Sequence, residues 1–178
     1  METSDEQLMA AVKKGDLDKL GVLYDRYNKR VYNYFVRSTA DYSESGDLTQ
    51  NVFVRILKYR GSYQKDKSFE TWIFQIARNL VRDHFKKMKV TYSRDENREE
   101  LPELIHEIDD KMEKENKLYQ AIEKLPDDKK DLILMSKFQG LKYEQIAEIR
   151  STSVSAIKVQ VHRTIKHLRE IYFEQLEA

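Results

Sequence analysis

The sequence predicts an all-α protein made of two small helical domains that a flexible acidic linker joins. Three observations lead to this fold class. The 178 residues include only 5 glycines and 2 prolines, which favours long helices over closely spaced turns. Apolar residues recur at steps of three and four nearly throughout, and no stretch reads as a strand. The acidic, less periodic stretch near the middle predicts domains at 1–90 and 113–178 with a linker at 91–112.

The first domain is predicted from its apolar stripes and helix-boundary residues. Gly15 ends a short first helix, and Ser68 is a plausible N-cap for the last helix of this domain. Between them, we expect a turn at 38–46 and a polar loop at 60–67. The expected helices of this domain span residues 5–14, 16–37, 47–59 and 69–88.

The second domain has clearer boundary signals. Pro126 suits the first turn of a helix, and Gly140 is a plausible residue just beyond its C-terminus. Residues 150–153 (RSTS) read as a turn. The expected helices of this domain span residues 113–124, 126–139, 142–149 and 154–173.

Several classes of protein are excluded or disfavoured by composition. The chain contains no cysteine, so disulfides, thiolate catalysis and cysteine-ligated zinc are ruled out. No run of about 18 apolar residues is present, and the first twenty residues lack the pattern of a secretion signal. We therefore expect a cytoplasmic protein.

Signals for catalysis are weak. His106-Glu107 lacks the second histidine of a zinc-protease helix, and Asp83-His84 is a pair without a nucleophile. His162 and His167 are five residues apart and diverge on a helix, so a shared metal is not expected. The sequence predicts neither an enzyme nor a metal or other cofactor.

The net charge of +1 conceals a strong pattern along the chain. Residues 54–94 carry 11 basic and 3 acidic side chains, whereas residues 95–136 carry 7 basic and 14 acidic ones. Residues 137–178 are again basic, with 7 against 5. Two positive regions separated by an acidic one suggest two contacts with a polyanion, although charge runs that are only solvated helix faces explain the pattern equally well.

The strongest local motif lies at 141–168 and predicts a helix-turn-helix. A short helix (YEQIAEI), a polar turn and a basic helix follow one another, and Ser153 can cap the second helix. Ile146, Ile157 and Val161 are expected to face inward. The positions expected to face outward, toward a DNA major groove, are Ser155, Ala156, Lys158, Val159, Gln160, His162 and Arg163.

A second basic face lies on the predicted helix 69–88. Exposed rings stack on unpaired bases while cations follow the backbone, so this helix and its aromatic neighbours fit single-stranded DNA. We expect Phe69 and Trp72 to be core residues and Tyr63, in the polar loop, to be the better stacking candidate. The polar side chains on this face, at steps of three or four, are Gln75, Arg78, Asn79, Arg82 and Lys86.

Blocks of this sequence resemble the extracytoplasmic-function (group IV) sigma factors of bacterial RNA polymerase, within the sigma-70 family. DLTQNVF at 47–53 and SFETWIFQIARNLVRDHFKK at 68–87 are similar to region 2 of that family. The segment from Leu125 to Glu170, which includes LKYEQIAEIRSTSVSAIKVQVHRTIKHLRE, is similar to region 4. The resemblance covers about residues 6–88 and 113–172, and the order and spacing of the blocks make it specific.

The resemblance implies a sigma factor that binds core RNA polymerase, recognises promoter −35 and −10 elements and melts the DNA. It implies region 2 contacts to the clamp coiled coil of β′ through Asp47, Gln50, Asn51 and Arg55. It implies −10 recognition and melting by Gly61, Ser62, Tyr63, Gln64, Lys65, Gln75, Arg78, Asn79 and Arg82. It implies region 4 docking on the β flap and −35 recognition by Ser155, Ala156, Lys158, Gln160 and Arg163.

The resemblance also implies that the acidic linker threads the RNA channel of the polymerase and that an anti-sigma factor holds the protein inactive. The chain departs from the family pattern at a few positions. Asn51 stands where an acidic residue is usual, Arg150-Ser151 replaces a usual Leu-Gly turn, and Lys142 occupies the position of a Ser or Thr cap.

Two other functions stay open at this point. KVQVHRTIKHL also resembles the last helix of LuxR-type regulators, which do not join polymerase, but such a regulator needs no strand-opening domain. A helical adaptor whose basic faces bind acidic partners is the other alternative, and a steep salt dependence of DNA binding would disfavour it.

Overall fold

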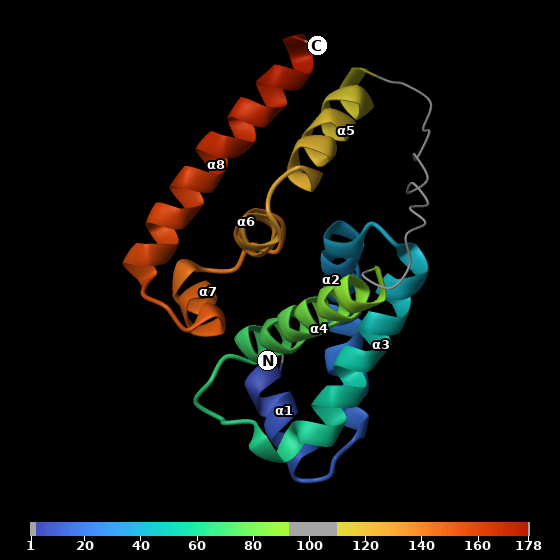
Figure 1. The fold of residues 1–178 in the computed structure, drawn as a ribbon. Coiled ribbons are helices and arrows are strands. Elements are labelled where there is room, and N and C mark those ends of the chain that lie inside the picture. The colour runs from blue at the N-terminus through green and yellow to red at the C-terminus, as the bar shows by residue number, and fades with distance from the viewer. Residues whose placement is uncertain (1–2, 93–109, 178) are drawn as a thin grey trace.

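The computed structural model describes residues 3–92 and 110–177, and within these ranges the chain is helical with no strand (Figure 1). The predicted all-α class is therefore confirmed. The elements in chain order are α1 (Asp5–Lys13), α2 (Asp18–Thr39), α3 (Tyr42–Tyr59), η1 (Arg60–Ser62), α4 (Phe69–Tyr92), α5 (Asp110–Glu123), α6 (Asp127–Ile133), η2 (Leu134–Phe138), α7 (Tyr143–Arg150) and α8 (Val154–Glu177).

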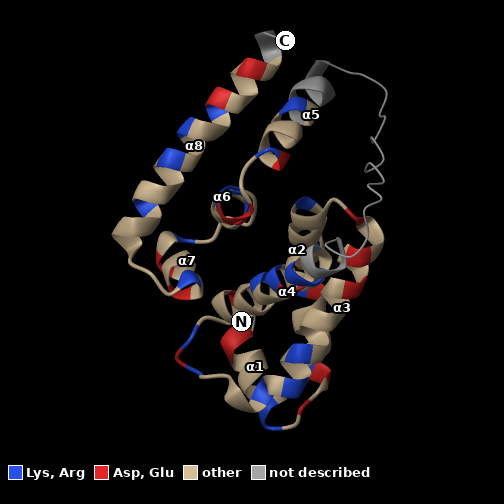
Figure 2. Cartoon of the chain, in the orientation of Figure 1, with Lys and Arg blue, Asp and Glu red and all other residues tan. Residues whose placement is uncertain are grey.

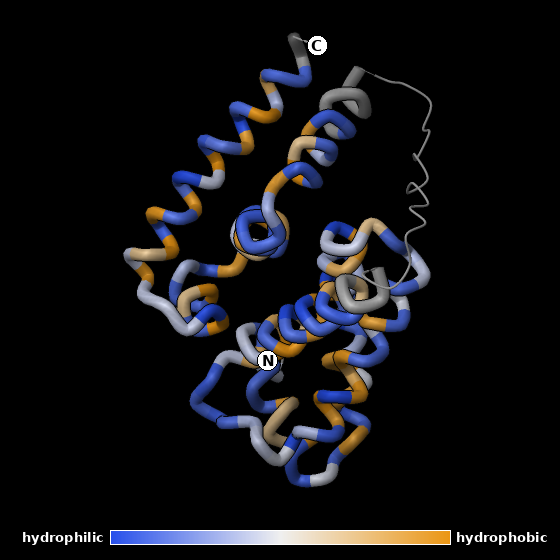
Figure 3. The backbone as a smooth tube through the Cα atoms, in the orientation of Figure 1, coloured by the Kyte–Doolittle hydropathy of each residue, from blue (hydrophilic) through white to orange (hydrophobic). Residues whose placement is uncertain are grey.

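Helices α1 to α4 pack together as the first module. The long helix α2 contacts α1, α3 and α4, so it lies at the centre of this group. Its inward residues Leu23, Val31 and Phe35 are fully buried, as are Val52 of α3 and Ile73 of α4. Figure 3 shows such hydrophobic positions recurring along the helices. Because the apolar stripe of each helix faces its neighbours, the opposite faces of α3 and α4 stay exposed and can carry function.

Helices α5 to α8 form the second module. The long helix α8 contacts α5, α6 and α7 and so organises this group. Ile146 of α7 packs with Ile157 and Val161 of α8, and all three are buried as expected. The crossing of α7 and α8 is the predicted helix-turn-helix (Figure 1).

The expected turn at 38–46 is wrong, because most of this segment is helical. α2 continues to Thr39, Ala40 alone takes a left-handed conformation (φ 55°), and α3 begins at Tyr42. The Asp41 side chain accepts a hydrogen bond from the backbone N–H of Glu44, which caps α3. The Ser45 side chain is buried and donates back to the Asp41 carbonyl, so a serine that reads as a turn residue supports the first turn of a helix.

The other boundaries differ less from the predictions. α4 reaches Tyr92, four residues beyond the expected end, and α8 reaches Glu177. The helix expected from Pro126 to Gly140 is α6 followed by a wider π-helical turn, η2, and Gly140 then has the positive φ of 67° that suits a C′ glycine. The predicted linker falls mostly on 93–109, outside the described residues, and the domain boundaries stay predictions.

The two modules touch each other, which the sequence does not reveal. α4 packs on α7, and α2 packs on η2. Buried apolar residues continue without a break from Phe74 and Ala77 of the first module to Leu134, Met135 and Ile146 of the second. The contact between the modules therefore has an apolar base on which polar side chains can be held.

Candidate nucleic-acid interface

The start of α8 is built to present side chains outward. Ser153 caps the helix as predicted: its Oγ accepts a hydrogen bond from the Ala156 N–H at 3.1 Å, and its carbonyl accepts from the Ile157 N–H at 3.1 Å. Ile157 and Val161 are buried against α7, which fixes the rotation of the helix. The predicted −35 residues Ser155, Lys158, Gln160 and Arg163 are consequently exposed, and Ala156 is half-buried.

The turn before α8 is tight and uses a residue other than glycine in a left-handed conformation. Ser151 has φ 51°, and its N–H donates to the Glu148 carbonyl at 3.1 Å. The Thr152 N–H donates to the Ala147 carbonyl at 3.0 Å, completing the close of α7. At the other end of α7, the Gln145 side chain accepts from the Lys142 N–H at 2.8 Å, so the turn keeps its geometry without the Leu-Gly and the Ser or Thr cap that the family pattern favours.

The basic face predicted on α4 is present, but its side chains differ in how far they are exposed to solvent. Asn79 and Arg82 are exposed and Gln75 is half-buried. The Arg78 side chain is only 12% exposed and is engaged by the second module. Lys86 is exposed, two turns along α4 from Asn79, and Figure 2 shows basic positions along this helix.

The loop predicted for −10 DNA is exposed at Gly61, Ser62, Gln64 and Lys65 but not at Tyr63. The Tyr63 ring is 1% exposed and its centroid lies 5.1 Å from that of Trp72. Its hydroxyl donates to the Lys67 carbonyl at 2.6 Å, and burial raises the pKa of this phenol to about 12.

The expectation that Tyr63 offers an exposed ring for base stacking is therefore wrong. The residue was expected in solvent because polar residues flank it, whereas the structure uses its ring to anchor the loop on the core. Phe69 is fully buried and Trp72 partly so, which confirms that these two rings belong to the core.

The residues predicted to contact polymerase share one side of α3. Asp47, Gln50 and Asn51 are exposed and lie at steps of three and four, so they form one face. Val54 continues this face and is 61% exposed. Arg55 is half-buried and its guanidinium lies 3.6 Å from the Asp83 carboxylate of α4.

A polar cluster joins the two modules, and sequence reasoning missed it. The Arg78 Nε lies 2.8 Å from Asp131 Oδ2, and these side chains are 12% and 13% exposed. The Tyr34 hydroxyl of α2 donates to the other oxygen of Asp131 at 2.8 Å, and burial is the main reason that the pKa of Tyr34 is raised. Arg150 of α7 pairs with Asp128 and lies 3.9 Å from Asp131.

Further polar contacts extend this junction. Arg30 of α2 lies 2.8 Å from the Glu70 carboxylate and donates to the Gln139 carbonyl at 2.7 Å. The Gln145 amide of α7 donates to Glu70 at 2.8 Å. The two contacts that cross the modules, Arg30 to Gln139 and Gln145 to Glu70, join residues more than 60 positions apart. No local pattern in the sequence could therefore have pointed to them.

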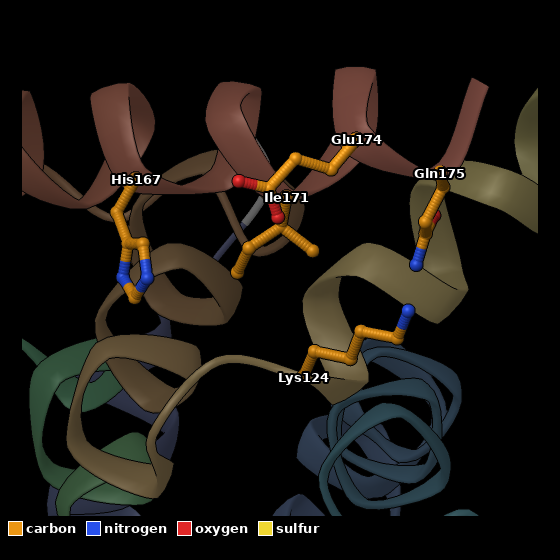
Figure 4. Close-up of a pocket in the computed structure, with 5 residues that line it drawn as sticks. All are labelled: Lys124, His167, Ile171, Glu174 and Gln175. Atoms are coloured by element: carbon orange, nitrogen blue, oxygen red, sulfur yellow. The ribbon is translucent and has the colours of Figure 1, made fainter. Parts of the chain in front are cut away.

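Two hollows lie near these surfaces. One, of about 330 Å³, lies between the end of α5 and the last turns of α8 and is lined by Lys124, His167, Ile171, Glu174 and Gln175 (Figure 4). Figure 4 shows the Lys124 and Gln175 side chains pointing toward each other across it. The other, of about 220 Å³, separates the basic face of α4 from α6. Its lining is of opposite charge on the two sides: Arg78, Val81, Arg82, Phe85 and Lys86 from α4, and Asp127, Asp128 and Asp131 from α6.

The described parts of the chain have neither a cluster of metal-binding side chains nor a membrane-spanning helix. Residues 3–92 and 110–177 contain no group of three or more acidic or histidine side chains placed to hold a metal ion. In the same ranges, no helix is long and apolar enough to cross a membrane.

Comparison with known proteins identifies the family of this chain. Residues 23–91 match the family model "Sigma-70 region 2", and residues 115–168 match "Sigma-70, region 4". The chain belongs to the sigma-70 family. It is 29% identical over 96% of its length to the ECF RNA polymerase sigma factor SigW of Bacillus subtilis, of which it covers 97%. It is 26% identical over 91% of its length to the RNA polymerase sigma-H factor of Pseudomonas aeruginosa, of which it covers 90%.

The solved structures agree with the fold. CnrH in complex with the cytosolic domain of CnrY superposes with a TM-score of 0.71 at 19% identity, covering 94% of this chain and 96% of CnrH. The sigma factor RpoE in complex with the anti-sigma factor NepR from Bartonella quintana superposes with a TM-score of 0.64 at 18% identity. The superposition covers 89% of this chain and 94% of that one.

The resemblance seen in the sequence is thus confirmed: the chain is an extracytoplasmic-function sigma factor, and its function is promoter-directed initiation of transcription by RNA polymerase. Sigma factors are in general regulatory subunits and not enzymes.

Proposed function

We propose that the two modules divide promoter recognition, with region 2 at residues 1–90 reading and melting the −10 element and region 4 at 113–178 reading the −35 element. Residues 91–112 would connect them. The observation that carries this proposal is the capped start of α8, where Ser155, Lys158, Gln160 and Arg163 are exposed while Ile157 and Val161 are buried. A helix held in this way can enter a major groove with its N-terminal residues foremost.

The −35 element is read by α8 in this proposal. Arg163 and Gln160 can each make paired hydrogen bonds to base edges, whereas Ser155 and Lys158 suit phosphate contacts. Ala156 leaves room for close approach and offers a methyl group for contact with thymine.

The −10 element is bound by α4 and the loop before it. Asn79 and Arg82 are exposed and Gln75 is half-buried, and together with Arg78 they form a basic and amide-rich face that suits an unpaired strand. Gly61, Ser62, Gln64 and Lys65 form the exposed rim of the loop that would hold a flipped base. Because the Tyr63 ring is buried, its part would be to shape the loop while other groups contact the base.

Core polymerase is the third partner in the proposal. The exposed face of α3 formed by Asp47, Gln50, Asn51 and Val54 would bind the β′ clamp coiled coil, with Arg55 at its edge. An apolar side chain between polar ones is the usual make-up of a protein-binding patch. Region 4 would dock on the β flap.

The remaining parts of the proposal concern regulation and location. The similar sigma factor RpoE of Bartonella quintana is in complex with the anti-sigma factor NepR, and we propose a partner of this kind for this chain. We also propose that the protein acts in the cytoplasm and has no catalytic activity or cofactor of its own. The LuxR-like alternative finds no support, because a match to region 2 over 23–91 has no place in such a regulator.

Transcription with core RNA polymerase on a library of promoters tests this function. We expect run-off products from a subset that shares two sequence elements at a fixed separation. Arg163→Ala should change the preferred upstream element, and Asn79→Ala with Arg82→Ala should impair opening, seen as reduced permanganate reactivity of thymines near the start site. Initiation that is unaffected by both sets of changes would contradict the assignment of these surfaces.

A further inference from the structure

The N-terminal helix α1 holds both ends of the loop between α3 and α4. This loop, residues 60–68 and called here the α3–α4 loop, is the one that we assign to a flipped base of the −10 element. α1 contacts η1 at the start of the loop and α4 at its end, and Figure 1 shows the loop running beside α1. Residues 5–13 of α1 lie outside the segment 23–91 that matches region 2, so that match gives them no part in promoter recognition.

Lys13 fixes the first half of the α3–α4 loop. It is the last residue of α1, and its ammonium group donates to the Tyr63 carbonyl at 2.7 Å. A hydrogen bond from a charged donor is stronger than one between two neutral groups. The Tyr63 backbone is extended here (φ −64°, ψ 131°) and its ring is buried, so the bond from Lys13 sets the direction of the main chain just before Gln64.

Glu6 fixes the other end of the loop. Its carboxylate accepts from the backbone N–H of Phe69, the first residue of α4, at 3.2 Å. The first N–H groups of a helix have no partner within that helix, and a carboxylate placed there also meets the positive end of the helix dipole. Glu6 therefore caps α4 from another helix and holds the point at which the loop becomes helical.

α1 is itself held firmly on the first module. Its side chains Met9 and Val12 are fully buried in the core. The Asp5 carboxylate accepts from the Tyr27 hydroxyl and pairs with the Arg26 guanidinium, each at 2.5 Å. Both partners belong to α2, the central helix of this module. Lys13 and Glu6 thus project from a helix that cannot shift without breaking these contacts.

The residues between the two fixed ends are exposed. Gln64, Lys65 and Asp66 lie in solvent. The Tyr63 hydroxyl donates to the Lys67 carbonyl at 2.6 Å, and the Lys67 N–H donates to the Gln64 carbonyl at 3.1 Å, so these residues form a closed turn. A loop that is ordered before binding loses less conformational freedom when it binds a ligand.

We propose that Lys13 and Glu6 are positioning residues for the −10 element, which hold the α3–α4 loop in the conformation that receives the flipped base and do not themselves touch DNA. This inference rests on the proposed role of the loop. Extruding a base costs free energy that its pocket must offset, and a preformed loop leaves more of the binding free energy for that base. Loss of either anchor should therefore lower the preference for one base over the others.

Transcription by the holoenzyme from promoters with a randomised −10 element tests the inference. Sequencing of barcoded run-off products gives the base preference at each −10 position, and a second pool with a randomised −35 element gives the preferences there. We expect Lys13→Ala to lower the preference at one −10 position by about fivefold, the effect typical of losing one hydrogen bond. Glu6→Ala should act at the same position, and neither variant should change the −35 preferences.

Conservative variants separate positioning from a loss of stability. Lys13→Arg keeps a charged donor and Glu6→Gln keeps an acceptor, so both should retain the base preference. Lys14→Ala removes the same charge from the adjacent exposed position and is the matched control, which should change no preference. Circular dichroism melting of each variant shows whether its helices remain folded.

Hydrogen exchange of the free chain provides a readout that does not depend on DNA. The backbone amides of residues 61–68 should exchange faster in Lys13→Ala and Glu6→Ala than in the unaltered chain, because a less ordered loop opens more often. They should exchange at the unaltered rate in Lys14→Ala. Equal exchange in all these chains would overturn the inference.

Two results of the transcription experiment would also overturn it. One is an unchanged −10 preference in Lys13→Ala. The other is an equal weakening by Lys13→Ala at every −10 sequence together with a shallower salt dependence, which would make Lys13 a direct phosphate contact.

The proposed function fails by a different result. Gln64→Ala combined with Lys65→Ala alters the exposed rim of the loop and should itself change the −10 preference. If this double variant has no effect, the assignment of the loop to a flipped base is wrong. If it changes the preference while Lys13→Ala and Glu6→Ala do not, only the positioning role of α1 is wrong.

Discussion

The Oγ of Ser153 accepts a hydrogen bond from the backbone N–H of Ala156 at 3.1 Å, and this single bond sets where α8 begins. The first residues of α8 are those proposed to read the −35 element, so loss of the cap would disturb the backbone that presents them. The same serine accepts the first main-chain bond of the helix from Ile157. Helix capping and the orientation of the exposed residues are thus linked through one side chain.

Removal of this cap should destabilise the second module. We expect Ser153→Ala to lower the free energy of unfolding by about 1 kcal/mol, because one N–H at the start of α8 loses its partner. Urea denaturation followed by circular dichroism measures the change. Thr152→Ala shortens the exposed neighbouring side chain and serves as the control. If both variants unfold at the same urea concentration as the unaltered chain, the Ser153 cap makes no contribution to stability.

Arg163 should contribute to recognition of the −35 element. We expect Arg163→Ala to weaken binding by about 1–3 kcal/mol and to relax the preference at one base pair if the guanidinium reads a base, or to weaken binding at all sequences if it holds a phosphate. Footprinting of the holoenzyme on promoter variants distinguishes the two. Arg169→Ala, two turns further along α8 and also exposed, is the control. A footprint unchanged by Arg163→Ala would refute the assignment.

The exposed face of α3 should be needed for polymerase binding and not for folding. Asp47 and Gln50 lie in solvent, so Asp47→Ala combined with Gln50→Ala should leave the melting temperature nearly unchanged while reducing co-purification with core polymerase. Asp25→Ala, on an exposed position of α2, is the control and should change neither the melting temperature nor the recovery of polymerase. Normal recovery of polymerase with the double variant would show that this face is not the polymerase contact.

Tyr34 should make the protein sensitive to alkali. Its pKa is raised well above the ordinary 10.0, chiefly by burial and then by the neighbouring Asp131 carboxylate. Below pH 10 the phenol is protonated in both the folded and unfolded chains, so its contribution is fully present. Above pH 10 the unfolded chain loses this proton while the folded chain keeps it, and the free energy of unfolding falls by up to about 1.4 kcal/mol per pH unit.

Urea titrations between pH 8 and pH 11 measure this slope. Tyr34→Phe should have a shallower decline above pH 10 than the unaltered chain, and Tyr42→Phe, on an exposed position, should decline as the unaltered chain does. The slopes are compared and not the absolute stabilities, because Tyr34→Phe also loses the hydrogen bond to Asp131. Equal slopes for all three chains would contradict the burial argument.

Much of the fold follows from the sequence because helical periodicity is a local property. The helix-turn-helix, the Ser153 cap and the Gly140 terminus were all predicted from neighbouring residues, and the structure has them. The helical conformation of most of 38–46 was not predicted, because Ser45 supports α3 only through its burial and its hydrogen bond to the Asp41 carbonyl. Local composition describes such a serine as a turn residue, and only its packing makes it helical.

The site divides in the same way. The exposure of Lys158, Gln160 and Arg163 followed from the periodicity of one helix, whereas the burial of Tyr63 depended on Trp72 and Phe69, which lie further along the chain. The pairing of Arg78 with Asp131 joins residues 53 positions apart and depends on how two modules meet. Patterns within one helix contain no information about such contacts.

The Arg78–Asp131 pair has a consequence for how this sequence can change over generations. Reversing the charges at both positions would keep an ion pair between the two modules, but it would remove the cation that we assign to the −10 element. A change at position 131 therefore affects only the contacts between the modules, whereas a change at position 78 also affects the proposed contact with DNA.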